Sequence, residues 1–139
     1  MAYDNNNVFA KILRGELPCI RLYEDELTLS FMDIMPQAEG HVLIIPKEPA
    51  ETLLELSEAG AQACMRTTQR MAKAVKAALQ PPGIMIVQFN GAAAGQTVPH
   101  FHFHVVPRHE GLAMIAHGAQ RGDDAKLHEI AEKIKAHIA

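Results

Sequence analysis

The sequence predicts a single α+β domain over residues 1–139, with a mostly antiparallel sheet of five strands. A chain of 139 residues is long enough to bury the core of one domain. Apolar residues recur at three- and four-residue steps near both ends and in one long central segment, which is typical of helices. Short runs rich in β-branched and aromatic residues lie between these segments and predict strands. The expected order is a helix, three strands, a long helix, two strands and a last helix.

The first half of the chain predicts a short helix and three strands. Apolar residues at positions 9, 12 and 13 predict the helix over residues 9–13. Residues 20–23 and 27–32 predict a hairpin around a tight turn. The continuous apolar run at 42–45 predicts a central strand that is covered on both faces.

The long helix has two candidate starting points. Thr52 begins a Thr-x-x-Glu capping box, and Ser57 is a second N-cap candidate. Apolar residues then recur from Ala61 to Leu79, and the Pro81-Pro82-Gly83 sequence ends the helix.

The second half of the chain continues with two strands and a helix. Residues 84–89 predict a fourth strand, and a small-residue loop at 90–95 leads to a fifth, so the two should pair antiparallel. The glycine-containing stretch 108–122 predicts a loop, and Asp123 or Asp124 is expected to cap the last helix.

Composition and charge exclude several classes of function. A formal net charge of −3 argues against broad nucleic-acid binding, which requires clustered Lys and Arg. Cys19 and Cys64 lie far apart without a CxxC spacing, so we expect two buried thiols and no disulfide framework. No signal peptide and no run of eighteen apolar residues is present, and we therefore expect a cytoplasmic protein without membrane contact.

One short segment concentrates three of the eight histidines. His100, His102 and His104 alternate with Phe101 and Phe103, which is the period-two pattern of a strand with two different faces. We expect all three imidazoles on one face and the apolar side chains in the core.

Aligned imidazoles allow two chemistries. Three histidines with an open fourth position could hold a catalytic zinc ion, or one imidazole could attack an electrophile while its neighbours stabilise charge. The preceding Gly95, Gln96 and Thr97 offer backbone N–H groups, an amide and a hydroxyl that suit phosphoryl oxygens. A zinc site needs no such cradle, so this loop favours a nucleophilic histidine acting on a phosphoryl group.

The histidine segment and its companions resemble the histidine triad (HIT) family of nucleotide-binding proteins, and within it the branch of small nucleoside phosphoramidate hydrolases. The resemblance rests on the run from His100 to Val106, on Asn90-Gly91 ten residues before it, and on the lead-in at 95–98. It extends over nearly the whole chain, through segments at 8–12, 23–25, 31–34, 36–38 and 40–47.

The resemblance implies a hydrolase or transferase of purine nucleoside monophosphate conjugates with a P–N or related bond. His102 would be the nucleophile that forms a nucleotidyl-histidine intermediate, His100 and His104 would flank the phosphate, and His41 would support the site. The alternatives are a regulatory nucleotide-binding module, a dinucleoside polyphosphate hydrolase and a His-ligated zinc protein.

The resemblance also implies the substrate-binding residues and a partner. Asp33 would accept the ribose hydroxyls. Contacts to the phosphate or leaving group would come from Asn90, Gly95 and Thr97, and the base would lie among Val8, Phe9, Ile12, Phe31 and Ile34. A homodimer is expected, built through the long helix and a strand.

No cofactor or metal is expected. Relatives with a structural zinc have a CxxC near the first helix, where this chain has Asn7 and Ala10. His109 and His117 follow the triad and have no counterpart in the resemblance.

Overall fold

A computed structural model of the chain describes residues 2–114 and 120–139. The predicted order of elements is confirmed in this part of the chain. The elements are α1 (Val8–Leu13), β1 (Arg21–Glu24), β2 (Thr28–Met32), β3 (Val42–Pro46), α2 (Glu58–Leu79), β4 (Gly83–Val87), β5 (Phe103–Arg108) and α3 (Asp124–Lys135), with a 3-10 turn η1 (Ala92–Ala94) between the last two strands. His117 and part of the predicted loop at 108–122 lie outside the described residues.

The strands form one antiparallel sheet in the order β1-β2-β3-β5-β4. The hairpin of β1 and β2 and the antiparallel pairing of β4 with β5 confirm the two strand pairs that the sequence predicted. β3 lies in the middle of the sheet and every one of its residues is buried, as its apolar run predicted. His104 of β5 is paired on one side with Leu43 of β3 and on the other with Val87 of β4.

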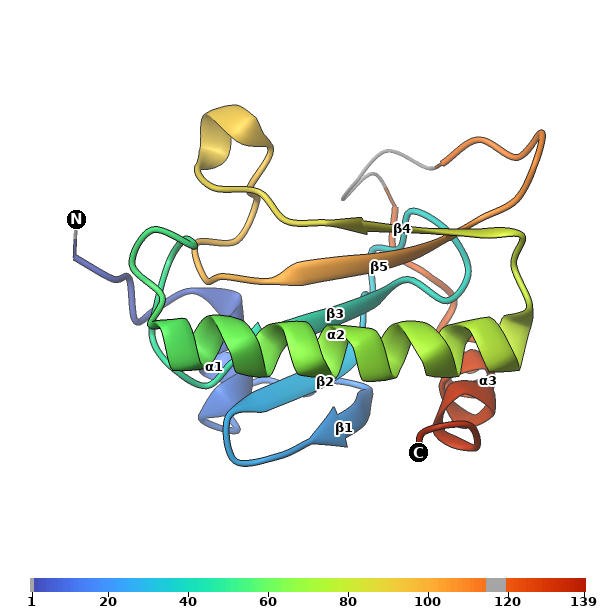
Figure 1. The fold of residues 1–139 in the computed structure, drawn as a ribbon, viewed down its shortest axis with the longest axis horizontal. Coiled ribbons are helices and arrows are strands. Elements are labelled where there is room, and N and C mark those ends of the chain that lie inside the picture. Colours follow the sequence, from blue (N-terminus) through green and yellow to red (C-terminus); the bar gives the residue numbers. More distant parts are fainter. Residues whose placement is uncertain (1, 115–119) are drawn as a thin grey trace.

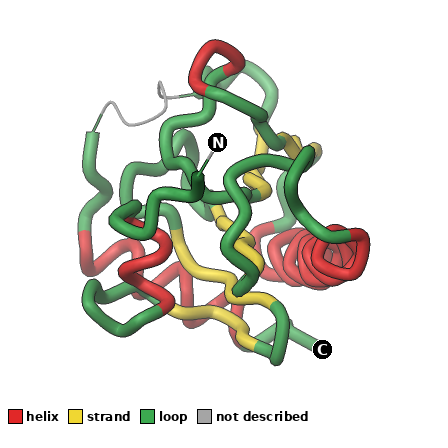
Figure 2. The backbone as a smooth tube through the Cα atoms, turned by 90° about the vertical axis from the view of Figure 1, so that its left-hand side faces the viewer, coloured by secondary structure: helices red, strands yellow, loops and turns green. Residues whose placement is uncertain are grey.

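The two faces of the sheet pack against different helices. Figure 1 shows α2 running along one face, and Figure 2 shows the same helix almost end-on beside the strands. Because side chains alternate along a strand, Val42 and Ile44 pack with Met71 and Val75 of α2, whereas their neighbours point away from it. On the opposite face, a second cluster joins α1 to the sheet through Phe9, Ile12, Leu29, Phe31, Leu43 and Ile45.

Helix capping decides between the two predicted starts of α2. The Ser57 side chain accepts a hydrogen bond from the Gly60 backbone, and α2 begins at Glu58. Thr52 was the wrong candidate, because its capping-box contact with the Glu55 carboxylate closes a separate turn ahead of the helix. Asp123 caps α3 by accepting from the Lys126 backbone N–H, as predicted.

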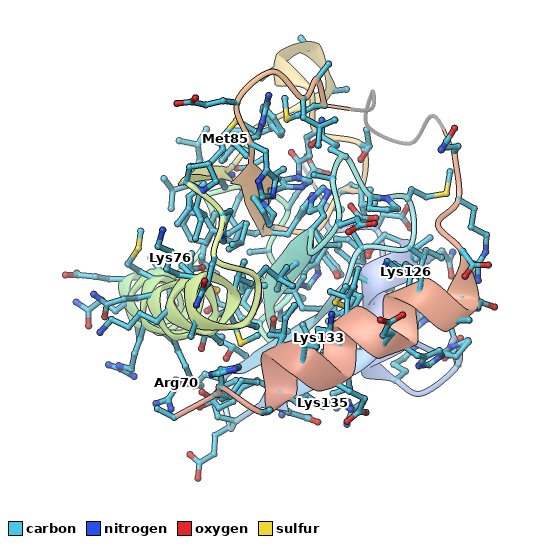
Figure 3. All side chains as sticks on the ribbon, turned by 90° about the vertical axis from the view of Figure 1, so that its right-hand side faces the viewer. Arg70, Lys76, Met85, Lys126, Lys133 and Lys135 are labelled. Carbon is cyan, nitrogen blue, oxygen red and sulfur yellow. The ribbon has the colours of Figure 1, made fainter. Side chains whose placement is uncertain are left out.

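Helix α3 packs against α2 and β1 and closes one end of the core. Its buried side chains Leu127, Ile130 and Ile134 join the cluster that contains Met71. Figure 3 shows Arg70 of α2 beside the C-terminal segment, where its guanidinium donates to the backbone carbonyl of Ala139. Among the described residues, no helix combines the length and apolarity needed to cross a membrane.

Candidate active site

The histidine segment is extended, but its regular strand begins later than the alternation predicted. β5 starts at Phe103, and His100 and His102 lie just before it. Its partner β3 ends at Pro46, which has no N–H to continue the ladder. The His100 imidazole instead forms a hydrogen bond with the Pro46 carbonyl at 2.8 Å. A side chain therefore takes the place of the next backbone hydrogen bond between the two strands.

The alternation of faces is confirmed for the residues around His102. Phe101 and Val105 are fully buried and belong to clusters that include side chains of α2. His102 and His104 line a pocket on the opposite face. His100 does not line this pocket: its two ring nitrogens bond to the Pro46 carbonyl and the Tyr3 hydroxyl, although its ring meets Phe9 as the His102 ring does.

His102 has its proton placed by the backbone. Its Nδ1 lies 2.7 Å from the backbone carbonyl of His100, and a carbonyl can only accept, so Nδ1 carries the hydrogen. The lone pair is therefore on Nε2. The edge-to-face contact with the Phe9 ring, 4.9 Å between centroids, holds the imidazole from the other side.

A chain of hydrogen bonds from Gln37 through His41, here called the relay, fixes the position of the proton on His104. The backbone N–H of Gln37 donates to His41 Nδ1 at 3.0 Å, so the His41 proton is on Nε2. His41 Nε2 lies 2.9 Å from His104 Nδ1 and donates to it. His104 consequently carries its own proton on Nε2. The two pocket histidines thus differ: His102 offers a lone pair, and His104 offers an N–H.

Asp33 lies beside this relay. One of its carboxylate oxygens is 3.4 Å from His41 Nε2, and the other accepts from the Met35 backbone N–H at 2.8 Å. The second contact is the turn-capping role expected of an Asp after a strand. Asp33 also lines the pocket, so a bound ligand can meet the same carboxylate.

Asp33, His41 and His104 are also close enough together to be considered as metal ligands. Asp33, His41 and His104 place one ligand atom each within 4.8 Å of one another. A metal on His41 Nε2 would need a lone pair there, while His41 Nδ1 already uses its lone pair to accept the Gln37 N–H. A neutral imidazole cannot supply both lone pairs. This donor set therefore does not suit a resident metal ion.

The pocket has a volume of about 370 Å³ and lies between α1, the sheet and the segment that carries Thr97 and His102. Every residue expected to sandwich the base contributes to its wall, and Thr97 and Asp33 line it as well. The sequence did not identify seven further lining residues: Leu17, Pro18, Cys19, Met32, Met35, Leu43 and Val98. Most of these lie in turns and connections, where no periodic pattern marks a residue as facing a cavity.

The prediction of two buried thiols is confirmed for Cys64 and wrong for Cys19. Cys64 is fully buried, and burial raises the pKa of its thiol to about 12. Cys19 is only partly buried because it forms part of the pocket wall.

The predicted phosphate cradle is arranged differently. The Gln96 amide donates to the carbonyls of Glu51 and Val98 and accepts from the Gly91 N–H, so its side chain braces the loop. The backbone N–H groups of Gly95 and Gln96 likewise bond inside the loop. Within the described residues, neither of them lines the pocket.

The Asn90 side chain also forms its hydrogen bonds away from the pocket. Its side-chain oxygen accepts from the Leu53 N–H at 2.8 Å and ties the loop to the turn ahead of α2. Of the four residues that the sequence proposed around the phosphate, only Thr97 lines the pocket in this structure.

The sequence and the fold were both found to resemble those of known proteins. Residues 14–111 match the family described as the HIT domain. The chain is 39% identical to adenosine 5'-monophosphoramidase from Schizosaccharomyces pombe over 101 residues, covering 73% of each protein. It is 37% identical over 130 residues to an adenylylsulfatase from Arabidopsis thaliana, covering 94% of this chain and 66% of that protein. A Hit-like protein from Bartonella henselae, whose structure contains an unknown ligand, superposes with a TM-score of 0.92 at 47% identity over 99% of both chains. The chain therefore belongs to the HIT family.

Proposed function

We propose that this protein cleaves purine nucleoside 5'-monophosphate conjugates, with a P–N bond as the preferred target, through a nucleotidyl-His102 intermediate. The observation that carries the proposal is the tautomer of His102. Its Nδ1–H is bonded to the His100 carbonyl, which puts the lone pair of the ring on Nε2, and His102 lines the pocket wall. The relatives named as a monophosphoramidase and an adenylylsulfatase support nucleotide hydrolase chemistry.

The reaction would proceed in two displacements. His102 Nε2 attacks the α-phosphorus, the P–N bond breaks, and the leaving amine takes one proton. Water then attacks the same phosphorus, the bond to Nε2 breaks, and one proton is released with the nucleoside monophosphate. The His104 Nε2–H is placed to donate to a phosphoryl oxygen in both steps, because the relay from Gln37 through His41 holds the proton there. The His100 carbonyl stabilises the positive charge on the nucleotidylated His102 ring.

The pocket suits a nucleoside. Phe9, Phe31 and Ile34 provide apolar surface for the two faces of a purine, and the Asp33 carboxylate at the same wall can accept ribose hydroxyls. Apolar contacts to the faces of a ring do not distinguish adenine from guanine, so the proposal covers both bases.

The test is to trap the covalent intermediate. Protein mixed briefly with adenosine 5'-phosphoramidate and quenched in alkaline denaturant should give one proteolytic peptide, containing His102, that carries an adenylyl group by mass spectrometry. Steady-state assays with AMP and GMP amine conjugates, adenylyl sulfate and a dinucleoside polyphosphate would then rank the leaving groups. Micromolar AMP binding without turnover of any of these substrates would contradict the enzyme and favour the regulatory module.

We also propose that the protein is a homodimer formed through α2 and β4. β4 is an edge strand, and a groove between it and α2 contains two exposed apolar side chains, Met65 (53% exposed) and Ile86 (43% exposed). Ile86→Asp should place a charge in that contact and reduce the mass measured by light scattering from two chains to one. Leu27→Asp, at a residue that is 51% exposed in the turn between β1 and β2, is the matched control and should stay dimeric, because this hairpin lies at the other side of the sheet from β4. A monomeric wild type would contradict the proposal.

A further inference from the structure

We propose that Tyr3 is a positioning residue for the reaction: its hydroxyl holds the His100 imidazole and, through it, the carbonyl that orients His102. This inference rests on the proposed function, because it takes His102 as the nucleophile. Tyr3 lies in the N-terminal segment, 97 positions from His100 in sequence. The sequence pattern gave no indication of any role for it.

The direction of each hydrogen bond follows from the atoms involved. His100 Nε2 lies 2.8 Å from the Pro46 carbonyl, which can only accept, so the His100 proton is on Nε2. His100 Nδ1 is then an acceptor, and the Tyr3 hydroxyl at 2.5 Å must donate to it. The Asn7 side-chain amide donates to the Tyr3 oxygen at 2.8 Å, which orients the hydroxyl hydrogen toward His100.

His100 is fully buried, and both of its ring nitrogens are bonded. Burial lowers the pKa of His100, so the imidazole stays neutral and keeps this arrangement. The backbone carbonyl of the same residue accepts the His102 Nδ1–H at 2.7 Å. Anchoring the ring at two points therefore also limits the movement of the carbonyl that sets the tautomer and direction of His102.

The N-terminal segment supports His102 from a second direction. Asn7, which holds Tyr3, also caps α1 by accepting the Ala10 N–H at 2.8 Å. α1 carries Phe9, whose ring contacts His102 edge-to-face. The Tyr3–Asn7 pair thus links the side of the site that holds His100 to the side that packs on His102.

The experiment compares Tyr3→Phe with Tyr23→Phe. Each change removes one hydroxyl that donates a hydrogen bond and keeps the ring; Tyr23 donates to Asp25 at 3.0 Å and does not line the pocket. Losing this part-buried hydrogen bond to His100 should lower kcat for adenosine phosphoramidate by about 3- to 10-fold in Tyr3→Phe, with KM within about twofold of wild type. Tyr23→Phe should leave both constants unchanged. Equal kcat values for Tyr3→Phe and wild type, or an equal loss in Tyr23→Phe, would overturn the inference.

A second readout separates positioning from catalysis. Spectra of protein with ¹⁵N-labelled histidine distinguish a protonated ring nitrogen from a lone-pair nitrogen, and they require no turnover. Wild type should show His100 protonated at Nε2 and His102 at Nδ1, and Tyr3→Phe should mix the tautomers of His100 and weaken the His102 signal. Unchanged tautomers in Tyr3→Phe would overturn the inference even in a protein without phosphoramidase activity.

A double-mutant cycle completes the test. In a His100→Ala background the hydroxyl of Tyr3 has lost its acceptor, so adding Tyr3→Phe should cause no further loss of kcat. A full additional loss there would show that Tyr3 does not act through His100. Absence of a nucleotidyl-His102 adduct in the wild type would instead remove the proposed function, a result that the tautomer spectra do not depend on.

Discussion

His102→Ala is expected to lower kcat/KM for an adenosine phosphoramidate on the order of 10⁴-fold, because the variant has no atom at the Nε2 position to form the covalent intermediate. The surrounding groups remain: the His100 carbonyl, the His41–His104 relay and the apolar wall do not depend on the lost ring. AMP should therefore still bind within a few-fold of the wild-type affinity. The measurement is a steady-state assay combined with calorimetric titration of AMP.

The control for this variant is His128→Ala. His128 lies on α3, is exposed and does not line the pocket, so its removal should leave kcat/KM within about twofold. A residual activity in His102→Ala close to that of His128→Ala would contradict the assignment of the nucleophile. A loss of AMP binding equal to the loss of turnover would show that His102 acts in binding the substrate instead.

The parts of the site that depend on local pattern were predictable. Strict alternation around His102 showed which side chains face the core, and the apolar run of β3 showed that this strand is central. The resemblance added the five apolar residues expected around the base, and all five line the pocket. These predictions succeed because they follow from the two-residue period of a strand and from a motif contained in a few neighbouring residues.

The parts that depend on distant partners were not predictable from the pattern. Gln96 has the right chemistry for a phosphate contact, but its amide is used by Glu51 and Val98, and only the folded loop shows that choice. The irregular start of β5 depends on Pro46, which lies 54 positions before His100. Tyr3 is the strongest example, since a tyrosine among Asn and Asp residues near a terminus carries no local sign of contact with the histidine segment.

Phe101→Ala is expected to lower the free energy of unfolding by about 3–5 kcal/mol, since it removes a fully buried aromatic ring and leaves a cavity. The ring packs with Leu56 and with Cys64 of α2, and it meets Phe103 edge-to-face at 5.4 Å between centroids. Chemical denaturation followed by circular dichroism measures the change. Phe101→Leu retains most of the apolar volume and should cost about 1.5 kcal/mol or less.

Leu54→Ala is the matched control, because this apolar side chain is 87% exposed and its loss should change the unfolding free energy by less than about 0.5 kcal/mol.

Phe101 also lies between His100 and His102, so the cavity left by Phe101→Ala should loosen the backbone that presents both histidines. Folded Phe101→Ala should therefore show a lower kcat than Phe101→Leu at equal substrate saturation. Equal kcat in the two variants would mean that the core face stabilises the fold without setting the position of the nucleophile. A one-residue slip would turn His102 into the core, so anchoring by Phe101 is expected to matter for both properties.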